Sequence, residues 1–523
     1  MSAGDPKESE HQDVSHAARS GLVQTLTVAG QALLTVTHVL LARLFGREVF
    51  GSYQASLAVL EMLTRSGTGG ADKGMLRFVA GHRARGEDAL VRSALGTGLR
   101  LCLLIAGGTA LLLILFARPI AALAREPAMT TGLRVMAPAA VLTGAVWVLV
   151  QASLAARAPR ANLIVRGIGE PILFLLAGVA AAGVGRSLVQ LSVAHVLAAG
   201  ATLALAVFVV GRVFGRGELA RSLWSPWLPG FARFSIPLGA AELLNTVMQR
   251  ADIVILTVFL GPNATAVYAA SEFITRVISN TRYVFDSIAA GVFSESLHLG
   301  QRERLRQNLV RMSRWVATLA APIAVTVVVL RRELLSLYGP SFGDGAAALS
   351  VLAIGHLVNA TLGLSGWILV AGGRSRLSLL NNVAAASVNI VAGLTLIPRF
   401  GPVGTAIASL GSIALLQIAA VIEVRLTEGV SPFDRSLAKP LVAAALAFLA
   451  ETVVSRHVAT TAWRVVLVIA IGLPTYGGAL ATLGLADEDR RVLLRALERL
   501  RRRRAAAPAP HRDAGSRPPR GPT

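Results

Sequence analysis

The stretch LARLFGREVFGSYQAS at residues 41–56 has a similar counterpart, LTVFLGPNATAVYAAS, at residues 256–271. The identical positions are Leu41 and Leu256, Gly46 and Gly261, Tyr53 and Tyr268, Ala55 and Ala270, and Ser56 and Ser271. Each copy joins the end of one apolar segment to the start of the next. In membrane proteins such duplication is typical of transporters, because two similar halves can move about a shared central site.

A second pair of stretches repeats at nearly the same interval. AARAPRANLI at 155–164 aligns with AGGRSRLSLL at 371–380, which places Arg160 opposite Arg376. Both copies run the same way through an even number of spans, so we expect two parallel repeats related by an axis along the membrane normal. Spans one to six form one lobe and spans seven to twelve the other. A final helix pair lies outside this symmetry.

The composition places the chain in a lipid bilayer. Hydrophobic residues make up 54% of the 523 residues and charged residues only 15%, whereas about 25% charge is usual in soluble domains. A helix of about 20 apolar residues spans the hydrocarbon core, and about fourteen such segments are present. We therefore expect an all-α integral membrane protein. The segments lie near 22–42, 50–79, 91–117, 131–156, 161–182, 188–211, 232–260, 265–296, 309–331, 346–371, 377–397, 402–424, 437–454 and 463–485.

The net charge of +22 would favour a nucleic-acid partner in a soluble protein. Whether it does so here depends on where the charges lie along the chain. Arginines concentrate in alternate loops, for example around Arg83, Arg216 and Arg304, while the opposite loops around Arg118 and Arg332 carry fewer. This asymmetry follows the positive-inside rule. We expect a multi-pass protein of the cytoplasmic membrane with both termini inside and no nucleic-acid partner.

These criteria divide the chain into five parts. The polar N-terminus contains no cleavable signal, and Cys102 is the single cysteine, which excludes disulfides and thiolate metal sites. The basic run RRVLLRALERLRRRR near the C-terminus either lies on anionic lipid headgroups or stays solvated. The parts are a cytoplasmic segment at 1–20, a first lobe at 21–214, a second lobe at 215–426, an additional helix pair at 427–485 and a basic cytoplasmic tail at 486–523.

Three spans carry polar residues in ordered stripes. Ionisable groups at bilayer depth are costly and usually face a bundle interior or a hydrated cavity. At about 100° per residue, each stripe falls on one face of its helix, while Arg250 points away from its stripe. The stripes are Gln54, Glu61, Arg65 and Asp72; Glu242, Asn245, Gln249 and Asp252; and Glu272, Arg276, Asn280, Tyr283 and Asp286.

Two interpretations of the stripes stay open. They either line a hydrated central cavity or form polar contacts between packed helices. Glu61 with Arg65, and Glu272 with Arg276, are acid and base four residues apart, so each pair can satisfy itself on one helix.

Nothing in the sequence indicates an enzyme. There is no G-x-S-x-G elbow, no P-loop and no histidine cluster with metal-ligand spacing, so we expect no cofactor and no metal. The GTGG at 67–70 lacks the Gly-Lys-Ser/Thr of a nucleotide loop. We expect it to be a flexible or locally unwound segment beside the cavity.

Several stretches resemble one family. They are ARLFGREVFGSYQ at 42–54, GTGGADKGMLRFVA at 67–80, FSIPLGAAELLNTVMQRADIVIL at 234–256, LYGPSFGDGAAALSVLA at 337–353 and NNVAAASVNIVAGLTLIPRFGPVGTAIAS at 381–409. Their order and spacing resemble the polysaccharide-biosynthesis, or oligosaccharide-flippase, branch of the multidrug/oligosaccharidyl-lipid/polysaccharide (MOP) exporter superfamily. The resemblance runs from about residue 25 to residue 430.

The resemblance implies two six-helix lobes arranged in a V around a cationic central cavity. It further implies transfer of lipid-linked sugar intermediates from the cytoplasmic to the outer leaflet. The cation-coupled multidrug exporter branch and a non-transporting scaffold of a polysaccharide-synthesis complex are the alternatives. The branch that flips the peptidoglycan precursor is disfavoured, because its Asn-x-x-Arg-Arg-x-Phe-x-Glu-Gly run is missing.

A flippase must carry a diphosphate and its sugars through hydrocarbon, which a hydrated groove allows. The candidates to neutralise the diphosphate are Arg276, Arg65 and Lys73. The candidates for hydrogen bonds to sugar hydroxyls are Gln54, Asn245, Gln249 and Asn280. The candidate coupling carboxylates are Glu61, Glu242, Asp252 and Glu272. Expected partners are the lipid-linked saccharide and membrane lipids, with polysaccharide polymerase or glycosyltransferase machinery as a further candidate.

Overall fold

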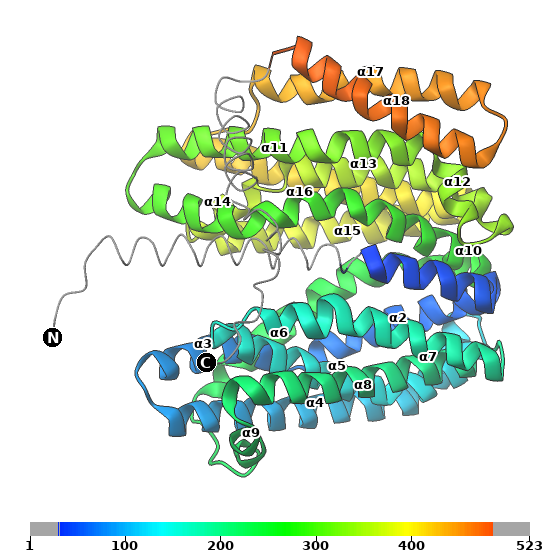
Figure 1. Cartoon of the computed structure of the whole chain (residues 1–523). Helices are drawn as coiled ribbons and strands as arrows, with labels where there is room; N and C mark the ends of the chain where they lie inside the picture. The colour runs from blue at the N-terminus through cyan, green and yellow to red at the C-terminus, as the bar shows by residue number, and fades with distance from the viewer. Residues whose placement is uncertain (1–29, 31, 485–523) are drawn as a thin grey trace, which may run out of the picture.

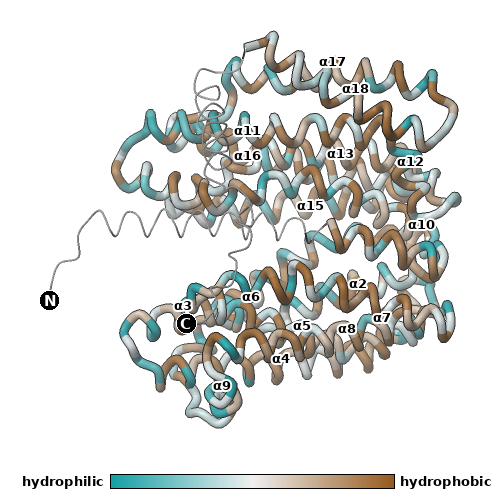
Figure 2. The backbone as a smooth tube through the Cα atoms, viewed as in Figure 1, coloured by the Kyte–Doolittle hydropathy of each residue, from teal (hydrophilic) through white to brown (hydrophobic). Residues whose placement is uncertain are grey.

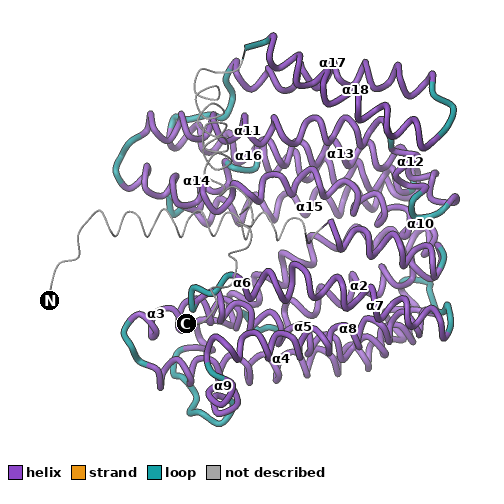
Figure 3. Tube along the Cα trace, in the orientation of Figure 1, coloured by secondary structure: helices purple, strands orange, loops and turns teal. Residues whose placement is uncertain are grey.

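The computed structural model describes residue 30 and residues 32–484. The described residues form helices and the turns between them, with no strand among them (Figure 3). The helices gather into two bundles, which meet at one end of the molecule and diverge toward the other (Figure 1). We call these the closed end, which contains Gly46 and Gly261, and the open end, which contains α3 and α14. The predicted segments at 1–20 and 486–523 lie outside the described residues.

The N-terminal bundle is built from the first half of the chain. Its elements are the helix Ala32–Phe45, α2 (Arg47–Gly67), α3 (Ala71–Ala84), α4 (Asp88–Leu123), α5 (Ala128–Ala155), α6 (Arg160–Asn162), the π-helical turn η1 (Leu163–Gly169), α7 (Glu170–Val184), α8 (Leu188–Phe214) and α9 (Arg216–Ser222). Its core packs apolar side chains of α2, α5 and α7, such as Tyr53, Leu133 and Phe174.

The C-terminal bundle begins within α10. Its elements are α10 (Phe231–His298), α11 (Arg302–Val329), α12 (Arg331–Ser336), the 3-10 turn η2 (Pro340–Gly345), α13 (Ala346–Leu362), α14 (Ser365–Ala371), α15 (Ser375–Phe400), α16 (Pro402–Glu428), α17 (Arg435–His457) and α18 (Thr461–Thr482). The last two helices pack on α11 at the outer edge of this bundle (Figure 1).

Among the described residues, eleven helical segments are long and apolar enough to cross a membrane. They are mainly hydrophobic, with many of the hydrophilic residues near the ends of the helices (Figure 2). The segment in α10 is counted once, although non-helical backbone at Gly261 (φ 72°, ψ −175°) divides α10 into two helices. The shorter apolar helix Ala32–Phe45 and the more polar α2 are not among the eleven. The all-α membrane fold is thus confirmed, while the count of fourteen spans stays a prediction.

The two copies of the repeated stretch share a glycine with positive φ at the equivalent position. Gly46 has φ 85° and Gly261 has φ 72°, and each ends one helix and lets the next begin. The second pair of stretches agrees as well, because Arg157 (φ 60°) and its counterpart Gly373 (φ 74°) both follow the end of a helix. Positive φ is costly for residues other than glycine. The duplication is therefore visible in the backbone and not only in the sequence.

The two copies also touch each other at the closed end. A Cβ atom added to Gly51 would lie 1.8 Å from the carbonyl oxygen of Pro262, so only glycine permits this approach. The Arg47 Nε donates to the carbonyl oxygen of Asn263 at 3.0 Å. Phe50 of α2 reaches into the core of the C-terminal bundle, with its ring 6.2 Å from that of Tyr338.

At the open end, α10 starts against the N-terminal bundle. Phe231 is buried in the same core cluster as Met75 of α3. The GTGG segment is unwound as predicted, because α2 ends at Gly67 and α3 begins at Ala71. A Cβ atom on Gly70 would lie 2.0 Å from the carbonyl oxygen of Ser235, so this break lets α10 pack closely. The lobe boundaries at 21–214 and 215–426, and the separate pair at 427–485, stay predictions.

Candidate functional site

Two large cavities lie on either side of the central part of α10. The N-side cavity occupies about 970 Å³ and the C-side cavity about 1490 Å³, each including the space at its open mouth. Both linings include the side chains of Arg250, Glu272 and Arg276. These three residues therefore form a wall that is shared by the two cavities.

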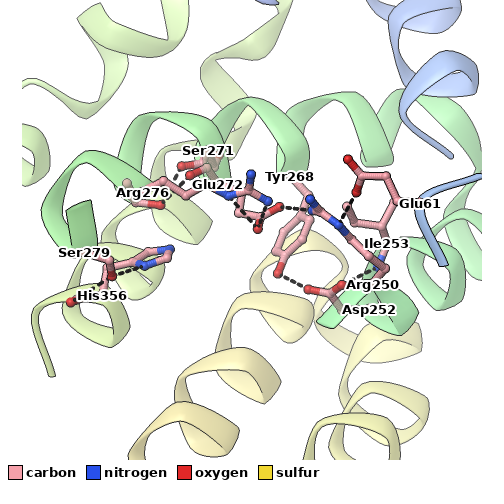
Figure 4. A network of polar contacts seen from close by, with 11 residues as sticks. Glu61, Arg250, Asp252, Ile253, Tyr268, Ser271, Glu272, Arg276, Ser279 and His356 are labelled. Carbon is pink, nitrogen blue, oxygen red and sulfur yellow. Dashed lines mark hydrogen bonds and ion pairs between the residues drawn. The ribbon is translucent and has the colours of Figure 1, made fainter. Parts of the chain in front are cut away.

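An ion-pair row forms this shared wall (Figure 4). Arg250 contacts Glu61 of α2 through Nε at 2.6 Å and lies 3.7 Å from Glu272 through Nη1. The Glu272 Oε1 accepts hydrogen bonds from Nη2 of Arg276 at 2.6 Å and from its Nε at 3.1 Å. Charges are thus paired continuously from the N-terminal bundle across α10, as buried charges must be.

The bend at Gly261 produces this row. Arg250 and Glu272 are equally far from Gly261 along the chain, one on each of the two helices that the bend creates. Folding α10 back on itself therefore places the two side chains opposite one another. The same hairpin lets the Tyr268 hydroxyl donate to Oδ2 of Asp252 at 2.6 Å (Figure 4).

One sequence-based expectation about this row is wrong, and Arg250 stands at the centre of the row although it was assigned no role. The helical wheel places Arg250 away from the polar stripe of its own helix, and it pairs instead with Glu61 and Glu272. Glu61 pairs with Arg250 and not with Arg65, whose guanidinium lies 3.8 Å from the Trp147 ring centroid and 4.0 Å from Glu242. The helical wheel failed because it treats each helix alone, whereas the partner of Glu61 comes from another helix. The pair Glu272 and Arg276 is as predicted.

The N-side cavity has aromatic walls and balanced charge. Three arginines and three glutamates line it, namely Arg166, Arg250, Arg276, Glu61, Glu170 and Glu272. This balance differs from the cationic cavity that the family resemblance implies. The Arg166 guanidinium lies 3.3 Å from the ring centroid of Trp147, a cation–π contact. Gln54 lines this cavity, and its buried Nε2 has no hydrogen-bond partner among the described residues.

The C-side cavity is lined mainly by neutral polar side chains. The predicted residues Asn245, Gln249 and Asn280 line it from α10. Facing walls on α13, α15 and α16 add further amides and hydroxyls, namely Asn359, Asn382, Asn389, Ser409, Ser412 and Gln417. Amides both donate and accept hydrogen bonds, so this lining suits ligands that are rich in hydroxyl groups.

The structure brings most of the predicted site residues to the two cavities. The residues placed on cavity walls are Gln54, Glu61, Asn245, Gln249, Asp252, Glu272, Arg276 and Asn280. Arg65, Lys73 and Glu242 line neither cavity. Lys73 lies on the first turn of α3 and contacts the neighbouring Asp72 at 3.5 Å.

The sequence interpretation missed Arg166, Arg250 and the distant walls of the C-side cavity. Arg166 lies in the π-helical turn η1, a distortion that is frequent at functional sites. It stands alone in the apolar segment 161–182 and belongs to none of the three polar stripes, so the helical period gave no signal for it. The amides of α15 fall within the stretch 381–409, which carries part of the family resemblance and lies outside the three polar stripes.

Comparison with known proteins identifies the family. Residues 18–289, slightly more than half of the chain, match the family described as polysaccharide biosynthesis protein. The probable flippase AglR of Haloferax volcanii is 26% identical over 236 residues, which cover 44% of this chain and 50% of the relative. The succinoglycan biosynthesis transport protein ExoT of Rhizobium meliloti is 26% identical over 328 residues, 61% of this chain and 62% of the relative. The chain thus spans between half and two thirds of these curated relatives.

Solved structures share the fold. The lipid II flippase MurJ in an inward closed conformation superposes with a TM-score of 0.72 at 12% identity, covering 88% of this chain and 98% of MurJ. An inward-facing multidrug resistance MATE family transporter of the MOP superfamily superposes with a TM-score of 0.68 at 13% identity, covering 78% of this chain and 98% of the transporter. At these identities the likeness establishes the fold alone. The family match shows that the chain belongs to the polysaccharide biosynthesis protein family.

Proposed function

We propose that this transporter is a flippase that moves lipid-linked oligosaccharide or polysaccharide precursors across the cytoplasmic membrane by alternating access. The observation that carries the proposal is the row Glu61–Arg250–Glu272–Arg276 between two large cavities. It places guanidinium groups where a diphosphate would pass, beside space that could hold a sugar chain.

Arginine suits this task because its guanidinium group binds phosphate oxygens in a bidentate manner. The side chains of Arg276 and Arg250 are 30% and 18% exposed, so each can contact a ligand in the cavities. Arg65 and Lys73 lie nearer the open end and would meet the headgroup as it enters. Gln54, with its free amide nitrogen, faces the same path.

The balanced charge suggests how binding is coupled to the cycle. Because Glu272 already neutralises Arg276, a diphosphate must displace that carboxylate from the guanidinium. Protonation of Glu61 or Glu272 would release Arg250 and Arg276 for the substrate, and deprotonation would favour substrate release. Glu242 and Asp252 remain candidate coupling carboxylates by the same reasoning.

Topology supports the proposal as well. If α10 crosses the membrane twice and the helices Ala32–Phe45 and α2 belong to two further spans, the chain crosses fourteen times with both termini in the cytoplasm. The open end then faces the cytoplasm, where lipid-linked precursors are made. Polymerase or glycosyltransferase machinery would be the source of the substrate and is a proposed partner.

A cation-coupled multidrug exporter is the second candidate. The observation that favours it is the fold likeness to a MATE transporter, together with the buried Asp252 that lines the C-side cavity. A drug exporter, however, does not need a wall of neutral amides.

Deletion of the gene separates these functions. We expect the lipid-linked saccharide to accumulate in the cytoplasmic leaflet and surface polysaccharide to fall, with unchanged drug sensitivity. Complementation with Arg276→Ala should not restore export. The matched control Arg306→Gln alters an exposed arginine that pairs with Glu303 at 2.8 Å, and it should restore export fully. Drug sensitivity with normal surface polysaccharide would refute the flippase.

A further inference from the structure

The C-side cavity contains a buried amide whose oxygen lacks a partner. Asn389 on α15 lines this cavity and is only 8% exposed. Its Oδ1 atom is buried and accepts no hydrogen bond from the described residues. A buried acceptor without a partner is costly, so an acceptor held in this state inside a cavity indicates that a ligand supplies the missing donor.

The charges around the cavity are confined to one wall. On the α10 side, Arg250 and Arg276 pair with Glu272, and Arg282 pairs with Asp286 at 3.3 Å. The facing walls from α13, α15 and α16 contribute no aspartate, glutamate, lysine or arginine to the lining. A ligand that reaches these walls therefore meets mainly neutral donors and acceptors, and the one arginine that extends to them, Arg282, is paired with Asp286.

Several of the facing side chains are fixed in place by one another. The Asn359 Oδ1 accepts from Nε2 of Gln417 at 2.7 Å and from Nη1 of Arg282 at 3.0 Å. The Asn359 Nδ2 donates to the Ser279 hydroxyl at 3.2 Å. This network joins α10, α13 and α16 and holds polar groups in defined orientations, which favours binding because little side-chain entropy is lost.

We propose that the C-side cavity is a subsite for uncharged sugar residues of the lipid-linked substrate, with Asn389 accepting a hydrogen bond from a sugar hydroxyl. The inference rests on the proposed function, since the diphosphate on Arg276 would direct the attached sugars across the shared wall. Without the space at its open mouth the cavity measures about 480 Å³, which lies within the 300–1,000 Å³ usual for small-molecule pockets. A uronic acid would bring a carboxylate to walls whose own residues include no cation and whose nearest arginine, Arg282, is already paired with Asp286, so it would bind less tightly.

The test uses the full chain in lipid nanodiscs and isothermal titration calorimetry with three probes. They are farnesyl diphosphate, farnesyl diphosphoryl-glucose and farnesyl diphosphoryl-glucuronic acid. We expect glucose to tighten binding relative to farnesyl diphosphate by about tenfold or more, as two or more hydrogen bonds allow. We expect glucuronic acid to give a smaller gain.

Asn389→Ala should reduce the gain from glucose by about three- to tenfold, as the loss of one neutral hydrogen bond predicts. Its affinity for farnesyl diphosphate should not change. The matched control is Ser387→Ala on the exposed face of the same helix. The Ser387 hydroxyl donates to the carbonyl oxygen of Val383, also on α15, at 2.9 Å. This control should keep the full gain.

Other outcomes would overturn the inference. An unchanged glucose gain in Asn389→Ala, or no gain in the wild-type protein, would exclude the subsite and leave the diphosphate site intact. Equal or tighter binding of the glucuronic acid probe would exclude the preference for uncharged sugars. Failure of the wild type to bind farnesyl diphosphate would contradict the proposed function itself.

If Asn389→Ala does not fold, Asn389→Asp preserves the size of the side chain, and it should lower affinity for the glucuronic acid probe more than for the glucose probe. Equal losses would overturn the inference.

Discussion

The pair Glu272 and Arg276 allows the proposed role of the arginine to be separated from a purely structural one. The perturbations are Glu272→Gln, Arg276→Gln and the double variant. Arg276 donates two hydrogen bonds to one carboxylate oxygen, at 2.6 and 3.1 Å. Glu272 has a second cation, Arg250, at 3.7 Å, and Arg250 is itself held by Glu61 at 2.6 Å.

These distances predict unequal losses of stability. Glu272→Gln leaves Arg276 without its carboxylate, and because hydrogen bonds to charged groups contribute about 1.5–3 kcal/mol, we expect a loss of about 2 kcal/mol at this partly exposed site. Arg276→Gln costs less, about 1 kcal/mol, because Arg250 still neutralises Glu272. In the double variant Arg250 keeps Glu61, so no charge is left unpaired. The double variant should therefore be more stable than the sum of the single losses by about 1–2 kcal/mol.

Transport distinguishes the two roles, because stability and substrate binding respond differently. We expect Arg276→Gln and the double variant both to lose export, measured as surface polysaccharide per unit of membrane protein. Arg276→Lys should keep part of the export activity, because lysine retains the positive charge but lacks the planar guanidinium group. Export at the wild-type rate by the double variant would refute the reasoning and leave Arg276 as a structural contact. Thermal unfolding of the purified variants checks that the proteins are folded.

Three further predictions concern other parts of the molecule. Arg47→Ala removes a contact across the closed end, so it should favour the outward-open state, measured as a longer distance between spin labels placed there. Glu451 is 2% exposed on α17, and its Oε1 accepts from Thr326; Glu451→Gln should retain thermal stability, whereas Glu451→Ala should lose about 1–3 kcal/mol. In a Cys102→Ser background, a cysteine at Arg332 should react with an impermeant thiol reagent in intact cells, and one at Arg304 should not; labelling at Arg304 would reverse the topology.

The repeat was predictable because its signal is local. A sharp joint between two helices needs positive φ, which glycine provides at low cost, so Gly46 and Gly261 mark the same joint in both copies. The pairing of Glu272 with Arg276 was predictable for a similar reason, since the helical period places both on one face. The expected stripe from Gln54 to Asp72 is wrong at its end, because Asp72 lies on α3, beyond the break that ends α2 at Gly67. The break between α2 and α3 was predictable from the glycines of the GTGG segment at 67–70.

The position of Arg250 could not be predicted, because it depends on contacts between distant segments. A helical wheel places Arg250 away from Asn245 and Gln249, yet the bend at Gly261 turns it toward Glu272. The partner of Glu61 is likewise chosen by packing of α2 on α10. Arg166 reaches the N-side cavity through a π-helical turn, a distortion that no regular period contains.

The contacts at the closed end suit an interface that must open and close. Arg43 donates to the carbonyl oxygen of Ser336 at 3.0 Å, and Arg47 donates to that of Asn263 at 3.0 Å. These groups are exposed, so water can replace each bond when the bundles separate, and the net cost of breaking it is small. The central row is different, because its charges are partly buried and need partners in every state. A substrate phosphate, or a proton on Glu272, can supply that compensation, so opening of the closed end would depend on what occupies the centre.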